Sequence, residues 1–159
     1  MNKYMNYEQY MKIAIEEALA GEKDGEPPLG GVLIDQGGNI IARSHDTVAK
    51  EHDMTCHSEL NLVKIASSKI GSDLSGCTVI CTCEPCPLCF TALWLSKVGT
   101  IVFGSTISDV LEIASDIQRE LNIPAEFMNN KSGNQIKIIK DVLREECIQL
   151  WKNHKLLLK

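Results

Sequence analysis

The sequence has no long apolar stretch, no excess of basic residues and no repeat or domain linker. No apolar run approaches the roughly 20 residues of a transmembrane helix, and residues 1–7 lack the apolar core of a signal peptide. The 16 basic residues are outnumbered by 21 acidic ones, giving a net charge of −5. This balance gives no electrostatic reason to expect a nucleic acid as the main partner. We therefore expect a cytoplasmic protein that does not act at a membrane.

The chain is long enough to build its own hydrophobic core. It has 159 residues, of which 44% are hydrophobic and 23% charged, as in ordinary globular domains. At this length a folded chain buries roughly 70% of the surface that its unfolded form exposes. We predict a single domain over residues 1–159 that needs no disulfides.

Helical and strand-like segments alternate along the chain. Apolar periodicity predicts helices at 7–21, 57–70, 87–98, 108–121 and 142–158. Short apolar runs predict strands at 29–35, 39–43, 77–81, 100–103 and 124–128, the first two forming a hairpin, whereas 135–139 fits either a strand or a helix start. This order predicts the α/β class, as a three-layer α/β/α sandwich with a mixed sheet.

Cysteine is concentrated in one short segment. Five of the seven cysteines fall between residues 77 and 89, and the full set is Cys56, Cys77, Cys81, Cys83, Cys86, Cys89 and Cys147. Without a secretion signal, such a cluster indicates metal ligands or reactive thiols more readily than disulfides. We therefore look for function in this region.

Two predicted helix starts carry residues that suit a catalytic zinc site. His57 begins one helix, and Cys86 and Cys89, three residues apart, begin the next, where the helix dipole favours thiolates. Three protein ligands leave the fourth position of a tetrahedral zinc to water, whose pKa then falls toward about 7. Glu59, two residues after His57, is placed to take a proton from that water and pass it to a substrate.

The cysteines also allow other kinds of site. Cys81, Cys83, Cys86 and Cys89 together would make a closed structural zinc site, although such sites usually draw their ligand pairs from two separate loops. Cys83 and Cys86 also form a Cys-x-x-Cys pair of the thioredoxin-like redox type. A zinc-stabilised binding module without catalysis is a further alternative. Only a hydrolytic enzyme gives Glu59 a role.

Three segments resemble the zinc-dependent deaminases of the cytidine and deoxycytidylate deaminase superfamily. They are residues 25–32, 52–59 and 83–89, and the likeness extends from the first helix to about Ser105. The resemblance implies a five-stranded sheet, one Zn²⁺ per subunit held by His57, Cys86 and Cys89, and Glu59 as the proton shuttle in a hydrolysis that releases ammonia. It also implies that the backbone of Gly31 lines the pocket. Relatives of this size are usually homodimers, to which the helix at 142–158 or the one beginning near Leu88 is expected to contribute.

Within this superfamily the chain resembles the guanine deaminases best. The run from Glu84 to Cys89, with a proline between the cysteines, is similar to theirs, and Asp116 is the nearest counterpart of an acidic residue that some of them place against the substrate. The resemblance thus implies an aminated purine base or related heterocyclic amine as substrate. The alternative is a tRNA-specific adenosine deaminase, which shares residues 25–27 and 102–104 with this chain, and a cytosine or nucleoside deaminase comes third.

Asp46 departs from the pattern of the purine-acting relatives. Eleven residues before the zinc histidine those proteins carry an Asn that hydrogen-bonds the substrate, whereas this chain has an Asp. An amide offers a donor and an acceptor, but an ionised carboxylate only accepts. We therefore predict that Asp46 binds a substrate edge that presents an N–H group. The alternative is a loop aspartate that points to solvent.

Overall fold

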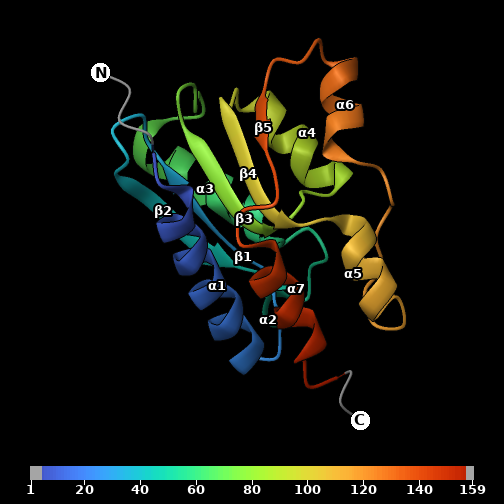
Figure 1. Cartoon of the computed structure of the whole chain (residues 1–159). Helices are drawn as coiled ribbons and strands as arrows, with labels where there is room; N and C mark the ends of the chain where they lie inside the picture. Colours follow the sequence, from blue (N-terminus) through green and yellow to red (C-terminus); the bar gives the residue numbers. More distant parts are fainter. Residues whose placement is uncertain (1–4, 157–159) are drawn as a thin grey trace.

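A mixed five-stranded sheet forms the centre of the computed structural model, which describes residues 5–156. Its strands are β1 (Gly30–Ile34), β2 (Ile40–His45), β3 (Thr78–Cys83), β4 (Thr100–Ser105) and β5 (Lys137–Ile139), arranged in the order β2-β1-β3-β4-β5 (Figure 1). Strand β1 pairs antiparallel with β2 and β3, whereas the β3–β4 and β4–β5 pairs are parallel. The predicted α/β class and the mixed sheet are confirmed.

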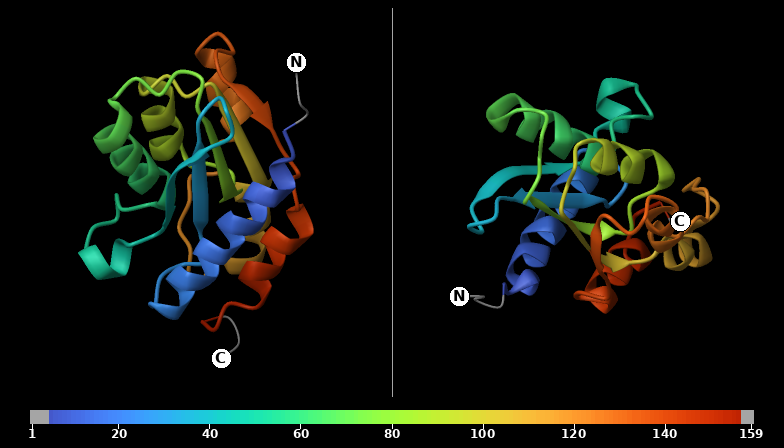
Figure 2. Two further views of the ribbon diagram at one scale, coloured as in Figure 1. Left: turned by 90° about the vertical axis from the view of Figure 1, so that its left-hand side faces the viewer. Right: turned by 90° about the horizontal axis from the view of Figure 1, so that it is seen from above.

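Helices cover both faces of the sheet. Helices α1 (Tyr7–Lys23) and α7 (Arg144–Lys152) lie on one face, and α3 (Ser58–Ile70) and α4 (Pro87–Leu95) lie on the other (Figure 2). Helix α5 (Ile107–Ala114) packs against α7, α6 (Ala125–Lys131) packs against α4, and the short α2 (Val48–Glu51) lies between β2 and α3. The molecule therefore has the predicted three layers. Within residues 5–156, none of the helices has the length and apolar character needed to cross a bilayer.

The core is divided by the sheet into two layers. Strands β1 and β3 are buried along their whole length, because each has helices on both faces. Leu33 packs with Leu62 and Leu93 under α3 and α4, while its neighbour Val32 packs with Met11 under α1. Successive strand residues thus serve opposite layers, as the period of two requires.

The contact between α1 and the sheet depends on Gly30. A Cβ at this position would lie 2.3 Å from the carbonyl oxygen of Ala14 and 2.4 Å from the backbone nitrogen of Ala18. Both atoms belong to the helix backbone and cannot move aside independently. The absence of a side chain therefore lets α1 pack directly on β1.

The structure corrects the prediction of a strand at 124–128. That segment begins helix α6, since Pro124 is the extended residue before the helix and Ala125 is its first residue. The backbone N–H of Ala125 donates a hydrogen bond to the buried carboxylate of Glu84, a partner so far away in the chain that local sequence does not reveal it. The last strand is instead β5, in the segment that fitted either a strand or a helix start.

Three predicted helices are shorter than expected, and one of them, predicted at 87–98, ends at Leu95. The helix predicted at 108–121 ends at Ala114, where the backbone N–H groups of Ile117 and Gln118 turn back to the Ala114 carbonyl. The helix predicted at 142–158 spans Arg144–Lys152, because Leu143 has a left-handed conformation with φ of 49°. Its predicted last two residues lie outside the described residues.

Candidate metal centre

The predicted metal ligands lie where two helices begin beside the carboxyl end of β3. His57 is the residue that precedes the first turn of α3, and Cys86 holds the same position before α4. Pro87 then takes the first helical position, where a missing N–H costs nothing. Cys89 lies within the first turn of α4 and is fully buried. The helix N-termini supply partial positive charge that favours thiolates here.

The three side chains converge on one point. His57 Nδ1 lies 3.6 Å from Cys86 Sγ and 3.4 Å from Cys89 Sγ, and the ligand atoms all lie within 4.8 Å of one another. Usual Zn–N and Zn–S bond lengths place nitrogen and sulfur about 3.6 Å apart on a tetrahedral ion. The geometry of the donor set therefore fits one zinc ion with a fourth position left open.

Each of these ligands alters the protonation of its neighbours. The hydrogen bond from Cys89 lowers the pKa of Cys86 to about 4, and His57 contributes in the same direction against the effect of burial. The contact with Cys86 in turn raises the pKa of His57 to about 9, although burial opposes it. Cys86 is therefore a thiolate at neutral pH, the form that binds metal ions.

Glu59 lies in the first turn of α3, beside the cluster but not part of it. Its side chain is buried, and the Ser58 hydroxyl donates a hydrogen bond to Oε2 at 3.1 Å. Burial raises the pKa of Glu59 to about 7, and the Cys86 thiolate adds to this rise. A carboxyl group in such surroundings is suited to accepting and returning a proton.

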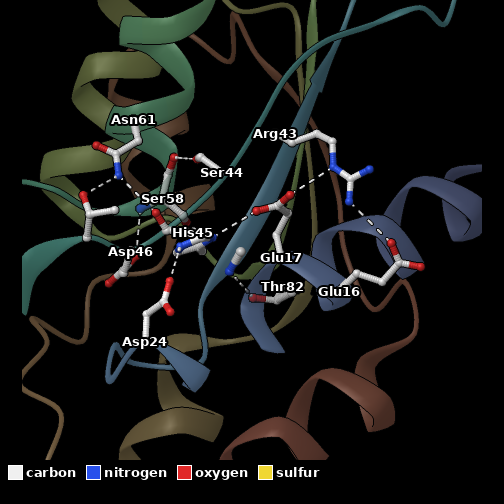
Figure 3. Close-up of polar contacts among 12 residues, drawn as sticks. Glu16, Glu17, Asp24, Arg43, Ser44, His45, Asp46, Ser58, Asn61 and Thr82 are labelled. Atoms are coloured by element: carbon white, nitrogen blue, oxygen red, sulfur yellow. Dashed lines mark hydrogen bonds and ion pairs between the residues drawn. The ribbon is translucent and has the colours of Figure 1, made fainter. Parts of the chain in front are cut away.

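Asp46 is buried at the start of α3 rather than exposed on a loop. Only 2% of the residue is accessible, and Oδ1 accepts a hydrogen bond from the backbone N–H of Ser58 at 2.7 Å. Figure 3 shows this contact beside the Ser44 hydroxyl, which donates to the Ser58 carbonyl at 2.6 Å. Burial raises the pKa of Asp46 well above its usual value, and repulsion from Glu59 adds to the rise. The solvent-facing alternative is therefore wrong.

Among the residues that the structure describes, there is no direct polar contact between the metal ligands and the other two predicted substrate residues, Gly31 and Asp116. Gly31 lies inside β1, where a Cβ would be 2.9 Å from Leu62 Cδ1 and 3.1 Å from the Ile80 carbonyl, so the glycine serves close packing under α3. Asp116 is exposed in the turn after α5. Across residues 5–156, no hydrogen bond or ion pair joins Asp116 to the metal ligands. Its role in substrate binding stays a prediction.

Glu120 is a carboxylate near the centre that sequence analysis missed. Glu120 is half-buried, and this burial is the main cause of its raised pKa. The Cys86 thiolate also raises the pKa of Glu120, whereas the hydrogen bond from Gln118 at 2.8 Å and the charge of His57 lower it. These effects place Glu120 within electrostatic reach of the metal ligands. No spacing rule could have found it, because it lies more than thirty residues beyond Cys86 in a segment without helix or strand.

The alternative cysteine sites are not assembled. In the part of the chain that the structure describes, the one cluster of suitable donor atoms consists of His57, Cys86 and Cys89. Cys81 and Cys83 lie within β3, where burial raises the pKa of both thiols well above the usual range. A four-cysteine zinc site and a Cys83–Cys86 redox pair both lack support.

Comparison with known proteins agrees with this geometry. Residues 5–105 match the model of the cytidine and deoxycytidylate deaminase zinc-binding region. The chain belongs to this family. It is 36% identical to the tRNA-specific adenosine deaminase of Bacillus subtilis over 88% of this chain and 83% of that protein. It is 31% identical to the guanine deaminase of the same organism, over 77% and 81% respectively.

A solved structure shows the same fold. The guanine deaminase from Nitrosomonas europaea superposes with a TM-score of 0.79 at 22% identity, covering 92% of this chain and 83% of that one. Together with the donor geometry, family membership makes this deaminase a hydrolase of C–N bonds in nucleobases or nucleosides, with one zinc per subunit.

Proposed function

We propose that this deaminase removes the amino group of a free purine base or a related heterocyclic amine by hydrolysis. The observation that carries the proposal is Glu59, buried beside a three-ligand cluster whose geometry leaves a fourth position open. Zinc bound there supplies Lewis acidity that activates water. A structural zinc site has no use for such a carboxylate.

The residues of the site divide the reaction between them. His57, Cys86 and Cys89 would hold the metal. Glu59 moves one proton from the attacking water to the ring nitrogen, and then moves the second proton from the new hydroxyl group to the departing amine as the C=O bond forms. Water adds its oxygen to the amine-bearing carbon, the C–N bond breaks, and ammonia leaves. Burial of Glu59 keeps bulk water away from this proton transfer.

Asp46 supports a particular edge of the substrate. Its Oδ1 accepts a hydrogen bond from the backbone N–H of Ser58, whereas its Oδ2 makes no hydrogen bond within residues 5–156. In that part of the chain, no fully buried side-chain oxygen or nitrogen lacks a hydrogen-bond partner. Oδ2 of Asp46 is therefore not fully enclosed by protein. We propose that it accepts an N–H of the heterocycle. Glu120 adds a further acidic group near the metal ligands.

The acidic surroundings favour a small uncharged base over a polyanion. Asp46, Glu59 and Glu120 lie around the metal ligands, and the chain as a whole carries a net charge of −5. Phosphate backbones bind through Lys and Arg contacts. The second candidate, deamination of adenosine in a tRNA, is favoured by the 36% identity to the Bacillus subtilis enzyme.

A panel of substrates separates these candidates. Ammonia release is measured from zinc-loaded protein with guanine, adenine, 2,6-diaminopurine, cytosine, their nucleosides, aminopteridines and a tRNA anticodon stem-loop. Glu59→Gln, which keeps the shape of the side chain but not its acidity, serves as the blank. Release from one free base, abolished in the blank, supports the proposal. Release from the stem-loop alone selects the tRNA candidate, and no release from any of them contradicts both.

The exposed face of α4 is our proposed interface for a second copy of the chain. Leu88 and Leu95 are 48% and 68% exposed, and Trp94 lines a cavity of about 310 Å³ between α4 and α6. Helix α7, the other expected contributor, packs against β4 and α5 of its own chain. A homodimer through α4 and a cytoplasmic location complete the proposal.

A further inference from the structure

Glu84 is a buried carboxylate that the proposed chemistry does not use. It follows the last residue of β3 and precedes the Pro85-Cys86 pair that begins the metal-ligand loop. Only 7% of the residue is exposed. Its backbone N–H donates to the Ser105 carbonyl at 2.8 Å, which fixes it beside the end of β4.

The two carboxylate oxygens of Glu84 bind two separate parts of the chain. Oε2 accepts a hydrogen bond from the backbone N–H of Ile107 at 3.0 Å, and Oε1 accepts one from the N–H of Ala125 at 2.7 Å. Ile107 and Ala125 are the first residues of α5 and α6, whose N–H groups have no partner within their own helices. Helix α6 also lacks a side-chain cap from its preceding residue, Pro124. One side chain therefore caps both helices.

This double cap closes a loop of the chain. The first and last residues of the segment 107–125 each donate a hydrogen bond to one oxygen of Glu84. We call this segment the strap. Within the strap, residues 115–124 contain neither helix nor strand. Residues 115–124 carry Glu120, which is half-buried and lies near enough to Cys86 and His57 for their charges to act on its pKa. Regular hydrogen bonding does not hold it there.

We propose that Glu84 is a positioning residue that fixes both ends of the strap to the metal-ligand loop. Residues 115–124 are thereby kept in one position, in which they form one wall of the substrate site. The substrate-site part of this inference rests on the proposed function, whereas the clamp itself does not. The carboxylate is required because one acceptor atom must face each N–H donor.

The test compares Glu84→Gln with a matched substitution nearby. Glutamine keeps one acceptor oxygen but turns its NH₂ group toward the other backbone N–H, so one cap is lost. Glu126→Gln is the control, since Glu126 follows Ala125 directly and only forms an exposed ion pair with Lys140 at 3.1 Å. The measurements are amide hydrogen exchange, zinc content, and kcat and KM for the purine that the panel identifies.

We expect Glu84→Gln to retain one zinc per chain, while the hydrogen-bonded amides within residues 115–124, which are Ile117, Gln118 and Ile123, exchange about tenfold faster or more. KM should rise about tenfold, with a smaller change in kcat, because the wall binds the substrate and the proton shuttle is left in place. The control should match the parent in all these measurements. Exchange and KM equal to those of the parent in Glu84→Gln would overturn the proposal.

A second variant covers the case in which Glu84→Gln does not fold. Ala125→Pro keeps the carboxylate but removes one of its two donors, and proline suits the first helical position after the extended Pro124. It should give the same faster exchange at 115–124, and unchanged exchange would contradict the clamp. If the parent protein deaminates nothing in the panel, the proposed function fails, while the exchange data still decide whether Glu84 holds the strap.

Discussion

Asp46 binds the backbone N–H of Ser58 through one carboxylate oxygen, and its other oxygen makes no hydrogen bond within residues 5–156, so it is suited to bind one edge of a heterocycle. Asp46→Asn retains the bond to Ser58 but presents an NH₂ donor in place of the second oxygen. A purine edge that offers an N–H should then lose affinity, and one that offers a lone pair should gain it. We expect the ratio of kcat/KM between two such purines to change about tenfold, as one hydrogen bond of about 1.4 kcal/mol would give.

The control for this substitution is an aspartate outside the site. Asp24→Asn changes an exposed carboxylate in the turn after α1 and should leave the ratio as it is. Zinc content in Asp46→Asn should equal that of the parent. An unchanged order of substrates in Asp46→Asn would show that this side chain only holds the start of α3.

The sequence was informative about residues wherever local spacing determines geometry. His57 with Glu59, and Cys86 with Cys89, each lie within a single helix start, so their relative positions follow from helical geometry. Glu120 reaches the same place only through the path of an irregular segment. Asp116, which was predicted from the similarity to relatives, lies in an exposed turn, and the half-buried Glu120 lies four residues further on.

At the scale of elements, the packing of α1 on β1 depends on the absence of a side chain at Gly30. Gly30→Ala would push a methyl group against the backbone of Ala14 and Ala18, which can yield only if the whole helix moves. Overpacking of this kind costs about 1–3 kcal/mol and occasionally more. We expect the free energy of unfolding to fall by about 3 kcal/mol, measured by urea denaturation.

Gly99→Ala is the matched control for this loss. A Cβ at Gly99 would meet its nearest atom, the Cys77 carbonyl oxygen, at 3.5 Å, an ordinary contact. The free energy of unfolding should change by less than about 1 kcal/mol. Equal stabilities for the two variants would mean that α1 adjusts its distance from the sheet without cost.

The prediction of elements succeeded where an apolar pattern runs unbroken. Strands β1 and β3 and helices α1 and α3 follow such patterns closely. The largest errors lie between Ile107 and Leu143, where long-range contacts decide the structure. Helix α6 begins at a carboxylate that is distant in sequence, and α7 begins after the left-handed Leu143. Neither cause is visible in local periodicity.

For the whole molecule, the metal joins parts of the chain that are otherwise separate. His57 comes from the start of α3, and Cys86 and Cys89 come from the loop after β3, so one ion links two helices of the same layer. A ligand at 1,000 times its Kd stabilises the folded state by about 4.1 kcal/mol. Since each kcal/mol is worth roughly 2–4 °C at this size, removal of zinc by a chelator should lower Tm by about 8–16 °C.

A ligand variant and the re-addition of zinc distinguish the loss of zinc from other effects of the chelator on Tm. His57→Ala lacks one ligand, so its Tm should respond to the chelator by only a fraction of that amount, and adding zinc back should restore the parent alone. Thermal unfolding followed by circular dichroism provides the measurement. A parent protein whose Tm is indifferent to chelation, with zinc loss verified by metal analysis, would contradict a stabilising role.

Assembly is the last property that the surface of the molecule allows us to predict. Leu95 is 68% exposed at the end of α4, beside the cavity that Trp94 lines. A charge placed there would be buried without a partner in a dimer but would meet only water in a monomer. Leu95→Glu should therefore sediment as a monomer, whereas Ile40→Glu, which changes a 42% exposed residue on the edge strand β2, should sediment as the parent does. If the parent is itself monomeric at micromolar concentration, or if Leu95→Glu remains dimeric, the face of α4 is not the interface.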